Sequence, residues 1–206
     1  MNIKVCGITQ LKQLQQLEGL NIDFAGLIFH KGSPRYMGDK IDKTALKNSD
    51  FDIKKVGVFV NPEMIDVLDA IDEYGLDVVQ LHGDESPEIC DDLSAEVEVI
   101  KAFSVDSKSN IDEMTAAYDA VCDYYLFDTA GKEPGGSGQK FDWKILLKAK
   151  IEKPFFISGG ISVDDIEALK KFKHPDFFGA DINSRFEKEP GVKDMGLVLQ
   201  FKQGLK

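Results

Sequence analysis

Short hydrophobic segments alternate with longer segments of helical periodicity along the whole chain. The short segments are rich in valine, isoleucine and phenylalanine, as expected of strands that are buried on both faces of a parallel sheet. Eight such segments predict strands, at residues 3–6, 24–29, 55–60, 77–81, 97–103, 124–128, 154–158 and 177–182.

The segments between the predicted strands carry apolar residues at helical spacing. Asn61-Pro62 and Ser86-Pro87 each place a capping residue before a first-turn proline, and Ser162 with Asp165 resembles a capping box. Residues 30–53 show the weakest helical pattern. The clearest predicted helices cover residues 11–17, 64–74, 111–122, 143–149, 163–172 and 195–205.

Eight uninterrupted βα units predict an α/β protein with one (β/α)8 barrel domain, a TIM barrel, over residues 1–206. An open, doubly wound sheet is the alternative, but it usually has fewer strands and a topological switch point. In a barrel, the chemistry lies at the carboxyl ends of the strands and in the loops that follow them. Candidate functional residues are therefore expected at those positions.

Composition narrows the classes of partner. The 36 acidic and 25 basic residues give a formal net charge of −11, which repels polyanions, so we expect no nucleic-acid partner. No apolar segment is long enough to cross a bilayer, which predicts a soluble cytoplasmic protein with no membrane partner. The three cysteines lack C-x-x-C spacing and the three histidines lie far apart, so we expect no metal.

Polar residues and glycines follow the ends of six predicted strands. Taken singly, each has a structural explanation: a buried cysteine, a turn-capping aspartate or a hydrogen-bonded core histidine. Because all of these positions meet at one end of a barrel, together they favour a functional site. They are Cys6-Gly7, the loop 30–38, the segment 80–83, Asp128-Thr129, Ser158-Gly159-Gly160 and the segment 181–185.

Asp128 ends a buried strand and is followed by a glycine-rich loop over residues 131–138. The loop matches neither common nucleotide signature, since Gly131 and Gly136 are followed by Ser137 where a P-loop has lysine. In barrels, the loop after the seventh strand commonly binds phosphate through backbone N–H groups. Gly159 and Gly160 fit that role because glycine permits close approach of a ligand to the backbone.

Seven segments in a fixed order resemble one known family. The segments are KVCGIT (4–9), SPRY (33–36), VGVFVN (56–61), VQLHGDE (79–85), LFDT with GGSGQKFDW (126–143), ISGGI (157–161) and PGVKD (190–194). They span nearly the whole chain, and through them it resembles the phosphoribosylanthranilate isomerase family of tryptophan biosynthesis.

The resemblance implies an Amadori rearrangement of a small phosphorylated substrate, without metal or organic cofactor. N-(5-phosphoribosyl)anthranilate would become 1-(2-carboxyphenylamino)-1-deoxyribulose 5-phosphate. By similarity, Asp128 is the general acid that opens the ring and Cys6 is the general base that removes the C2 proton. Strands one and six should face each other across the barrel mouth, with the sugar between them.

Further contacts are expected at the anthranilate end and at the phosphate end of the substrate. We expect Arg35 to bind the anthranilate carboxylate, and Gln80, His82 and Asp181 to contact the substrate. Backbone N–H groups should hold the phosphate, although Arg185 stands where the family usually has glycine. The phosphate-binding residues are expected to be Gly159, Gly160, Ser184 and Arg185, and the loop with Gly135 and Gly136 to fold over the substrate.

Three other functions remain open from the sequence. The chain could be another sugar-phosphate barrel of the tryptophan or histidine pathways, with different acids and bases. It could be a thiol hydrolase with Cys6 as the nucleophile, which requires an ordered base close to Cys6. It could also bind phosphorylated ligands without turnover. The sequence leaves open whether the protein is a monomer or a homodimer.

Overall fold

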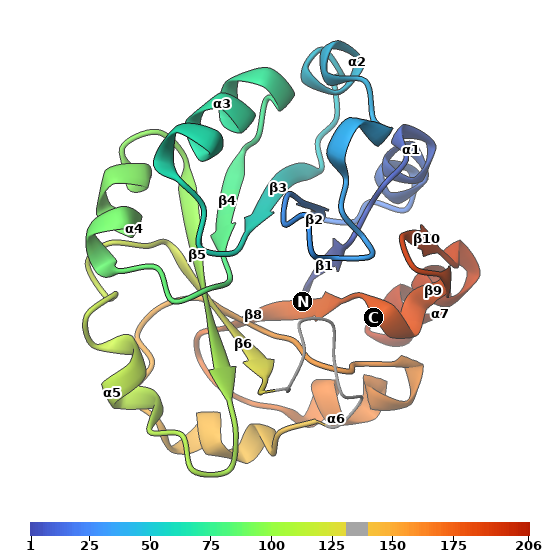
Figure 1. The fold of residues 1–206 in the computed structure, drawn as a ribbon. Helices are drawn as coiled ribbons and strands as arrows, with labels where there is room; N and C mark the ends of the chain where they lie inside the picture. The colour runs from blue at the N-terminus through green and yellow to red at the C-terminus, as the bar shows by residue number, and fades with distance from the viewer. Residues whose placement is uncertain (131–139) are drawn as a thin grey trace.

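The computed structural model describes residues 1–130 and 140–206 and forms a closed parallel barrel (Figure 1). Neighbouring strands in the sequence are hydrogen-bonded neighbours in space, and β8 closes the barrel against β1. The strands are β1 (Asn2–Cys6), β2 (Phe24–Ile28), β3 (Lys54–Phe59), β4 (Val78–Leu81), β5 (Glu98–Val105), β6 (Tyr124–Thr129), β7 (Phe155–Ile157) and β8 (Phe177–Ile182).

The predicted (β/α)8 fold is confirmed, and each strand begins and ends within two residues of its predicted bounds. The agreement has a physical reason. Parallel strands in a barrel are buried both by side chains inside it and by helices outside it, so each reads as a continuous hydrophobic segment.

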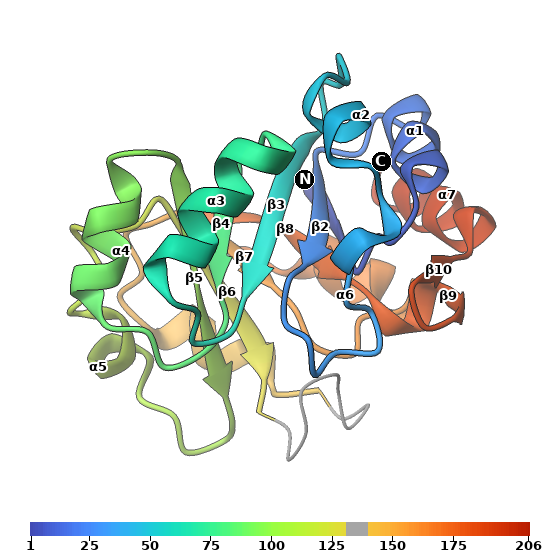
Figure 2. The same cartoon turned by 45° about the horizontal axis from the view of Figure 1, so that its top comes forward.

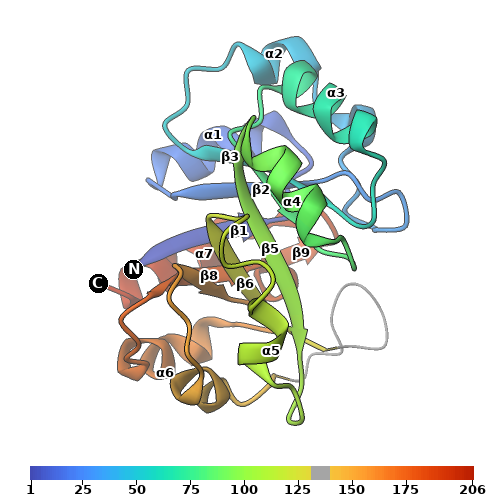
Figure 3. The ribbon, with the colours of Figure 1, turned by 90° about the vertical axis from the view of Figure 1, so that its left-hand side faces the viewer.

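Helices and short 3-10 segments surround the barrel (Figure 1). Figure 3 shows the ring from the side of β5, with β5 between the helices α4 and α5. The α-helices are α1 (Leu11–Gly19), α2 (Lys43–Lys47), α3 (Met64–Tyr74), α4 (Pro87–Ser94), α5 (Ile111–Thr115), α6 (Ile166–Lys171) and α7 (Met195–Gly204). The 3-10 segments are η1 (Gly38–Lys40), η2 (Trp143–Lys148), η3 (Val163–Asp165) and η4 (Ser184–Phe186).

Two predicted helices are shorter or tighter than the pattern suggested. The segment 143–149 forms the 3-10 helix η2, and the segment 111–122 is α-helical only over α5. After α5, backbone bonds run from Tyr118 N–H to the Thr115 carbonyl and from Val121 N–H to the Tyr118 carbonyl. These bonds span three residues, so the chain continues as tight turns toward β6.

Two of the three predicted helix starts are confirmed. Ser86 is the N-cap of α4 with proline at its first position, and Ser162 forms the predicted capping box with Asp165. The prediction at Asn61 is wrong, because α3 begins at Met64 with Glu63 as N-cap. Asn61 instead has a positive φ of 46°, and its side-chain oxygen accepts a hydrogen bond from the Asp84 backbone N–H. A contact with the loop after β4 therefore takes the place of a helix cap.

The barrel interior is filled by inward-facing side chains of alternate strand residues. At the amino ends of the strands the interior is aromatic, with Phe24 making edge-on contacts with Tyr124, Phe156 and Phe178. Aliphatic side chains such as Val58, Ile100 and Leu126 follow. Polar side chains line the interior at the carboxyl ends of the strands. Figure 2 shows the loops that follow these ends on one side of the barrel.

An antiparallel hairpin follows η4 and consists of β9 (Glu187–Glu189) and β10 (Val192–Lys193). It lies near α1 and α7 at the edge of the molecule (Figures 1 and 2). Within residues 1–130 and 140–206, no helix is long and apolar enough to cross a membrane.

Candidate active site

A cavity of about 280 Å³ opens at the carboxyl ends of the barrel strands. Arg185 is absent from its lining and has an exposed side chain, while Gly135 and Gly136 lie outside the described residues. The structure brings together nine predicted site residues in the cavity lining: Cys6, Arg35, Gln80, His82, Asp128, Gly159, Gly160, Asp181 and Ser184.

A second cavity, of about 450 Å³, lies at the opposite end of the barrel around Phe24 and Tyr124. It is larger, but it contains none of the predicted site residues. Since chemistry in this fold lies at the carboxyl ends of the strands, the smaller cavity is the candidate active site.

Cys6 is the last residue of β1 and its thiol is buried against β2. A Cβ atom on Gly26 would lie 2.8 Å from the Cys6 Sγ, so only glycine leaves room for the sulfur there. Burial raises the pKa of the Cys6 thiol, and Asp181 raises it further. The nearby ammonium groups of Lys4 and Lys193 oppose this rise without cancelling it.

Asp128 lies near the end of β6, across the barrel mouth from Cys6. Its Oδ1 accepts a hydrogen bond of 2.8 Å from the Thr129 backbone N–H, which fixes the carboxyl group. Gly159 has a φ of 91°, and a Cβ atom there would lie 2.8 Å from Asp128 Oδ1 and 2.2 Å from Thr129 Oγ1. The glycine after β7 is therefore required for the position of Asp128.

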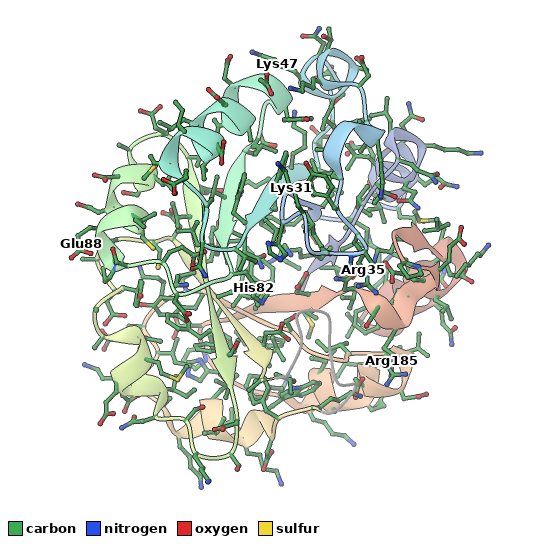
Figure 4. All side chains as sticks on the ribbon, viewed as in Figure 1. Lys31, Arg35, Lys47, His82, Glu88 and Arg185 are labelled. Carbon is green, nitrogen blue, oxygen red and sulfur yellow. The ribbon has the colours of Figure 1, made fainter. Side chains whose placement is uncertain are left out.

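His82 lies between Gln80 and Asp128 near the centre of the barrel mouth (Figure 4). Its Nε2 atom is 3.2 Å from Asp128 Oδ2, and its Nδ1 atom is 2.7 Å from Gln80 Nε2. When the amide donates to Nδ1, the imidazole proton is on Nε2 and faces the carboxylate. The buried Gln80 Oε1 has no hydrogen-bond partner among the described residues, so it is an open acceptor at the cavity wall.

Asp181, the fifth residue of β8, is bound on both oxygens. Lys4 Nζ lies 2.8 Å from Oδ1, and the Ser158 hydroxyl donates to Oδ2 over 3.0 Å. All three side chains are buried. Asp181 is therefore an ion-paired carboxylate in the cavity floor.

Arg35 comes from the loop after β2 and lies toward the β9–β10 hairpin (Figure 4). Its guanidinium binds Glu187, whose carboxylate also accepts from Lys193 Nζ over 2.7 Å and from the Gly191 backbone N–H over 3.0 Å. Burial raises the pKa of the Glu187 carboxyl, but Arg35 and Lys193 outweigh it and leave the pKa below its ordinary value. Lys193 also donates to the Asn183 side chain, which lines the cavity.

The sequence interpretation missed three charged residues that bind side chains of the cavity lining: Lys4, Glu187 and Lys193. Of these three residues, only Lys4 could have been recognised from the sequence. A lysine inside a strand that is otherwise buried on both faces requires a buried partner. The partner itself, Asp181, is 177 positions away in the chain.

Gly159 and Gly160 both have positive φ, 91° and 68°, and turn the chain at the cavity wall after β7. Ser184 lines the same cavity from the start of η4. These positions leave backbone close to the cavity without a Cβ atom at either glycine. Their binding of phosphate stays a prediction, as does the binding of a carboxylate by Arg35.

Comparison with known proteins gives a consistent assignment. The family model for N-(5'-phosphoribosyl)anthranilate isomerase matches residues 3–204. A protein of that name from Parabacteroides distasonis is 42% identical over 205 residues, covering 98% of this chain and 92% of the relative. Another from Phocaeicola vulgatus is 38% identical, covering 100% of this chain and 98% of the relative.

Solved structures agree with the sequence relatives. Phosphoribosylanthranilate isomerase from Thermotoga maritima superposes with a TM-score of 0.84 at 31% identity, covering 100% of this chain and 98% of that chain. A phosphoribosylanthranilate isomerase in complex with reduced 1-(o-carboxyphenylamino)-1-deoxyribulose 5-phosphate superposes with a TM-score of 0.81 at 28% identity and the same coverage. From its sequence, its barrel and these relatives, the chain belongs to the phosphoribosylanthranilate isomerase family.

Proposed function

We propose that the chain converts N-(5-phosphoribosyl)anthranilate to 1-(2-carboxyphenylamino)-1-deoxyribulose 5-phosphate, with Asp128 as general acid and Cys6 as general base. One observation carries this assignment of roles. A carboxyl group and a thiol, on strands separated by β7 and β8, line the same cavity from opposite sides. A sugar held between them would present its ring oxygen to one group and its C2 proton to the other.

In the first step, protonated Asp128 donates to the furanose ring oxygen and the bond from that oxygen to C1 breaks. The anilino nitrogen supplies the electron pair, which gives an open-chain Schiff base with a positive charge on nitrogen. Asp128 is left as a carboxylate, which the Thr129 N–H and the adjacent His82 can stabilise.

In the second step, the Cys6 thiolate removes the C2 proton and the Schiff base becomes a neutral enolamine. Tautomerisation then adds a proton at C1 and removes one from the C2 hydroxyl, which gives the ketone. The rearrangement as a whole neither consumes nor releases protons. Asp128 has given one proton to the ring oxygen and Cys6 has taken one from C2, so Cys6 releases a proton to solvent and Asp128 takes one up before the next turnover.

Two positions in the cavity suit the two anionic ends of the substrate. Arg35, Lys193 and Glu187 together carry a net charge of +1, which favours the anthranilate carboxylate on the Arg35 side. The glycine turn at Gly159 and Gly160, with the backbone at Ser184 and Arg185, suits the phosphate. Gln80, His82 and Asp181 face the sugar between them.

The reaction can be tested by following the loss of phosphoribosylanthranilate fluorescence, with the substrate generated in situ from anthranilate and phosphoribosyl pyrophosphate. Wild-type protein should remove the signal enzymatically, and Cys6→Ala should do so far more slowly. Binding of the aminoaldose without turnover would instead favour a non-catalytic barrel. An acyl-enzyme burst with ester substrates would favour a thiol hydrolase.

We further infer a cytosolic enzyme. Its three cysteines, Cys6, Cys90 and Cys122, are all free thiols, as is usual for proteins of reducing compartments. It would work as a monomer or homodimer. A solved relative from Thermotoga maritima, 27% identical, is described as a dimeric isomerase from which monomers were generated. Sedimentation of the purified protein distinguishes the two states.

A further inference from the structure

Lys4 lies on β1, two residues before Cys6, so both side chains point to the inside of the barrel. The lysine is fully buried beneath the active-site cavity. Placing an ammonium group there is costly unless its charge is paired. The roles proposed above for Cys6 and Asp128 make no use of this charge.

The ammonium group of Lys4 has two neighbours. On one side it donates to Asp181 Oδ1 over 2.8 Å, and the Ser158 hydroxyl holds the second carboxylate oxygen. On the other side lies the side chain of Cys6, two residues along the same face of β1, and the charge of Lys4 lowers the pKa of this thiol. The lysine therefore joins a buried carboxylate to the thiol at the cavity floor.

We propose that Lys4 is a positioning residue for the reaction, and that its ammonium group is the buried counter-ion of the Cys6 thiolate, held in place by Asp181. The proposal deepens the assignment of Cys6 as general base and rests on it. Lys4 neither touches the substrate nor transfers a proton in this scheme.

The charges around Cys6 support Lys4 as its main cation. Among the causes that shift the pKa of the thiol, Lys4 gives the largest decrease, and it opposes the increases due to burial and to Asp181. Burial lowers the pKa of Lys4 itself, but Asp181 and Cys6 leave it above its ordinary value, so the group stays charged at neutral pH.

Other charged groups near the thiol are less suited to this role. Burial leaves the pKa of Lys193 below its ordinary value, and its ammonium group is bound to Glu187 and Asn183. The remaining charged or titratable side chains of the cavity lie on the β2, β4 and β6 sides and are Arg35, His30, His82 and Asp128. None of them is among the main causes that shift the Cys6 pKa.

The proposal can be tested on the free enzyme, without turnover. The rate of alkylation of Cys6 by iodoacetamide is measured against pH, with peptide mass spectrometry separating Cys6 from Cys90 and Cys122. In Lys4→Met the midpoint should rise by about one pH unit or more, which means about tenfold slower alkylation below both midpoints. A folded Lys4→Met protein with the wild-type midpoint would overturn the proposal.

Lys101→Met is the matched control. Lys101 on β5 is equally buried and forms an ion pair of similar length, 2.9 Å, with Glu85. It is not among the main causes that shift the Cys6 pKa, so this variant should lose stability and leave the alkylation midpoint close to the wild-type value. A similar shift in both variants would show that loss of a buried ion pair, and not loss of the counter-ion, is responsible, and would also overturn the proposal.

Lys4→Met leaves Asp181 buried without its cation and could fail to fold. The double variant Lys4→Met/Asp181→Asn leaves no unpaired charge. Its thiol should still titrate above the wild type, because Lys4 affects the thiol more strongly than Asp181 does. An alkylation midpoint of Cys6 at or below the wild-type value in the folded double variant would refute the proposal that Lys4 stabilises the Cys6 thiolate.

Failure of this proposal can be distinguished from failure of the proposed mechanism. If Cys6→Ala keeps wild-type turnover, the thiol is not the base, whatever its titration. If Cys6→Ala is inactive while Cys6 in Lys4→Met is alkylated with the wild-type midpoint, Cys6 remains the general base and the proposal that Lys4 is its counter-ion is wrong.

Discussion

Arg35 and Glu187 form a bidentate ion pair at the edge of the active-site cavity. Arg35 Nε lies 2.9 Å from both carboxylate oxygens, and Nη2 lies 2.7 Å from Oε2. The two residues are 152 positions apart and join the loop after β2 to the β9–β10 hairpin. The pair fixes the plane of the guanidinium, so its remaining N–H groups are oriented before a substrate arrives.

Arg35→Ala should weaken substrate binding. A charge-assisted hydrogen bond contributes about 1.5–3 kcal/mol, so we expect KM to rise by about tenfold or more. Glu187→Gln should raise KM less, because the guanidinium remains but is held less firmly. Lys31→Ala is the control, since Lys31 is an exposed lysine of the same loop outside the cavity lining. Steady-state kinetics with unchanged KM and kcat/KM in Arg35→Ala would remove Arg35 from the site.

Cys6→Ala and Asp128→Asn should lower kcat by about 10²- to 10⁴-fold each, the usual contribution of a general acid or base. Substrate affinity should change much less. Cys6→Ser should not restore activity, because a hydroxyl group is a far poorer base than a thiolate. Cys90→Ala and Cys122→Ala should leave kcat nearly unchanged, since both thiols are buried outside the cavity lining.

Those losses would be measured in single-turnover experiments on authentic substrate, which separate chemistry from product release. Wild-type kcat in Cys6→Ala would exclude the thiolate base. Asp181 would not be a simple replacement, because both of its oxygens are already occupied by Lys4 and Ser158.

The reactivity of the free Cys6 thiol should depend on pH. Burial and Asp181 raise its pKa above the ordinary value, so the thiolate is the minor form at neutral pH. Deprotonation increases with pH, and the rate at which iodoacetamide alkylates Cys6 in the wild type should therefore rise through pH 7–9, with no plateau below the ordinary thiol value of about 8.5. An alkylation rate that levels off below pH 8 would contradict the raised pKa.

The proposed phosphate position makes opposite predictions for Arg185 and Gly159. The Arg185 side chain is exposed and outside the cavity lining, so Arg185→Ala should change KM by less than about twofold if only its backbone serves. Gly159→Ala should lose most activity, because its φ of 91° disfavours a side chain and the new Cβ would collide with Thr129 and Asp128. A strongly raised KM in Arg185→Ala would assign its charge to the phosphate.

Much of the fold was predictable because local patterns and global burial agree. The eight strands are hydrophobic on both faces, and their period and length distinguish them from the helices. Strand ends in a barrel share one rim, so Cys6, Asp128 and Gly159 could be placed in one site before any distance was known. Their chemical roles came from the family resemblance and not from the pattern.

Short-range signals failed in two ways: at Asn61 a distant segment competes for the capping groups, and over 143–149 the type of helix differs from the prediction. Asn61 reads as a helix cap, but its side chain and backbone bind the loop after β4, at Asp84 and Glu85. The segment 143–149 reads as an α-helix but is a 3-10 helix, started by the Asp142 side chain accepting from the Lys144 N–H. A periodic pattern records which side is buried and not how tightly the turn closes.

The sequence alone determined the barrel, the order of its strands and the residues at its rim, because burial of apolar side chains acts through patterns that repeat along the chain. Only the tertiary structure decided how the charges are paired. Lys4 had to find a buried partner, but nothing near it in the chain identifies Asp181, and the same holds for Arg35 and Glu187. A buried charge requires a counter-charge at hydrogen-bond distance, and that distance is set by the closure of the barrel, which brings β8 against β1.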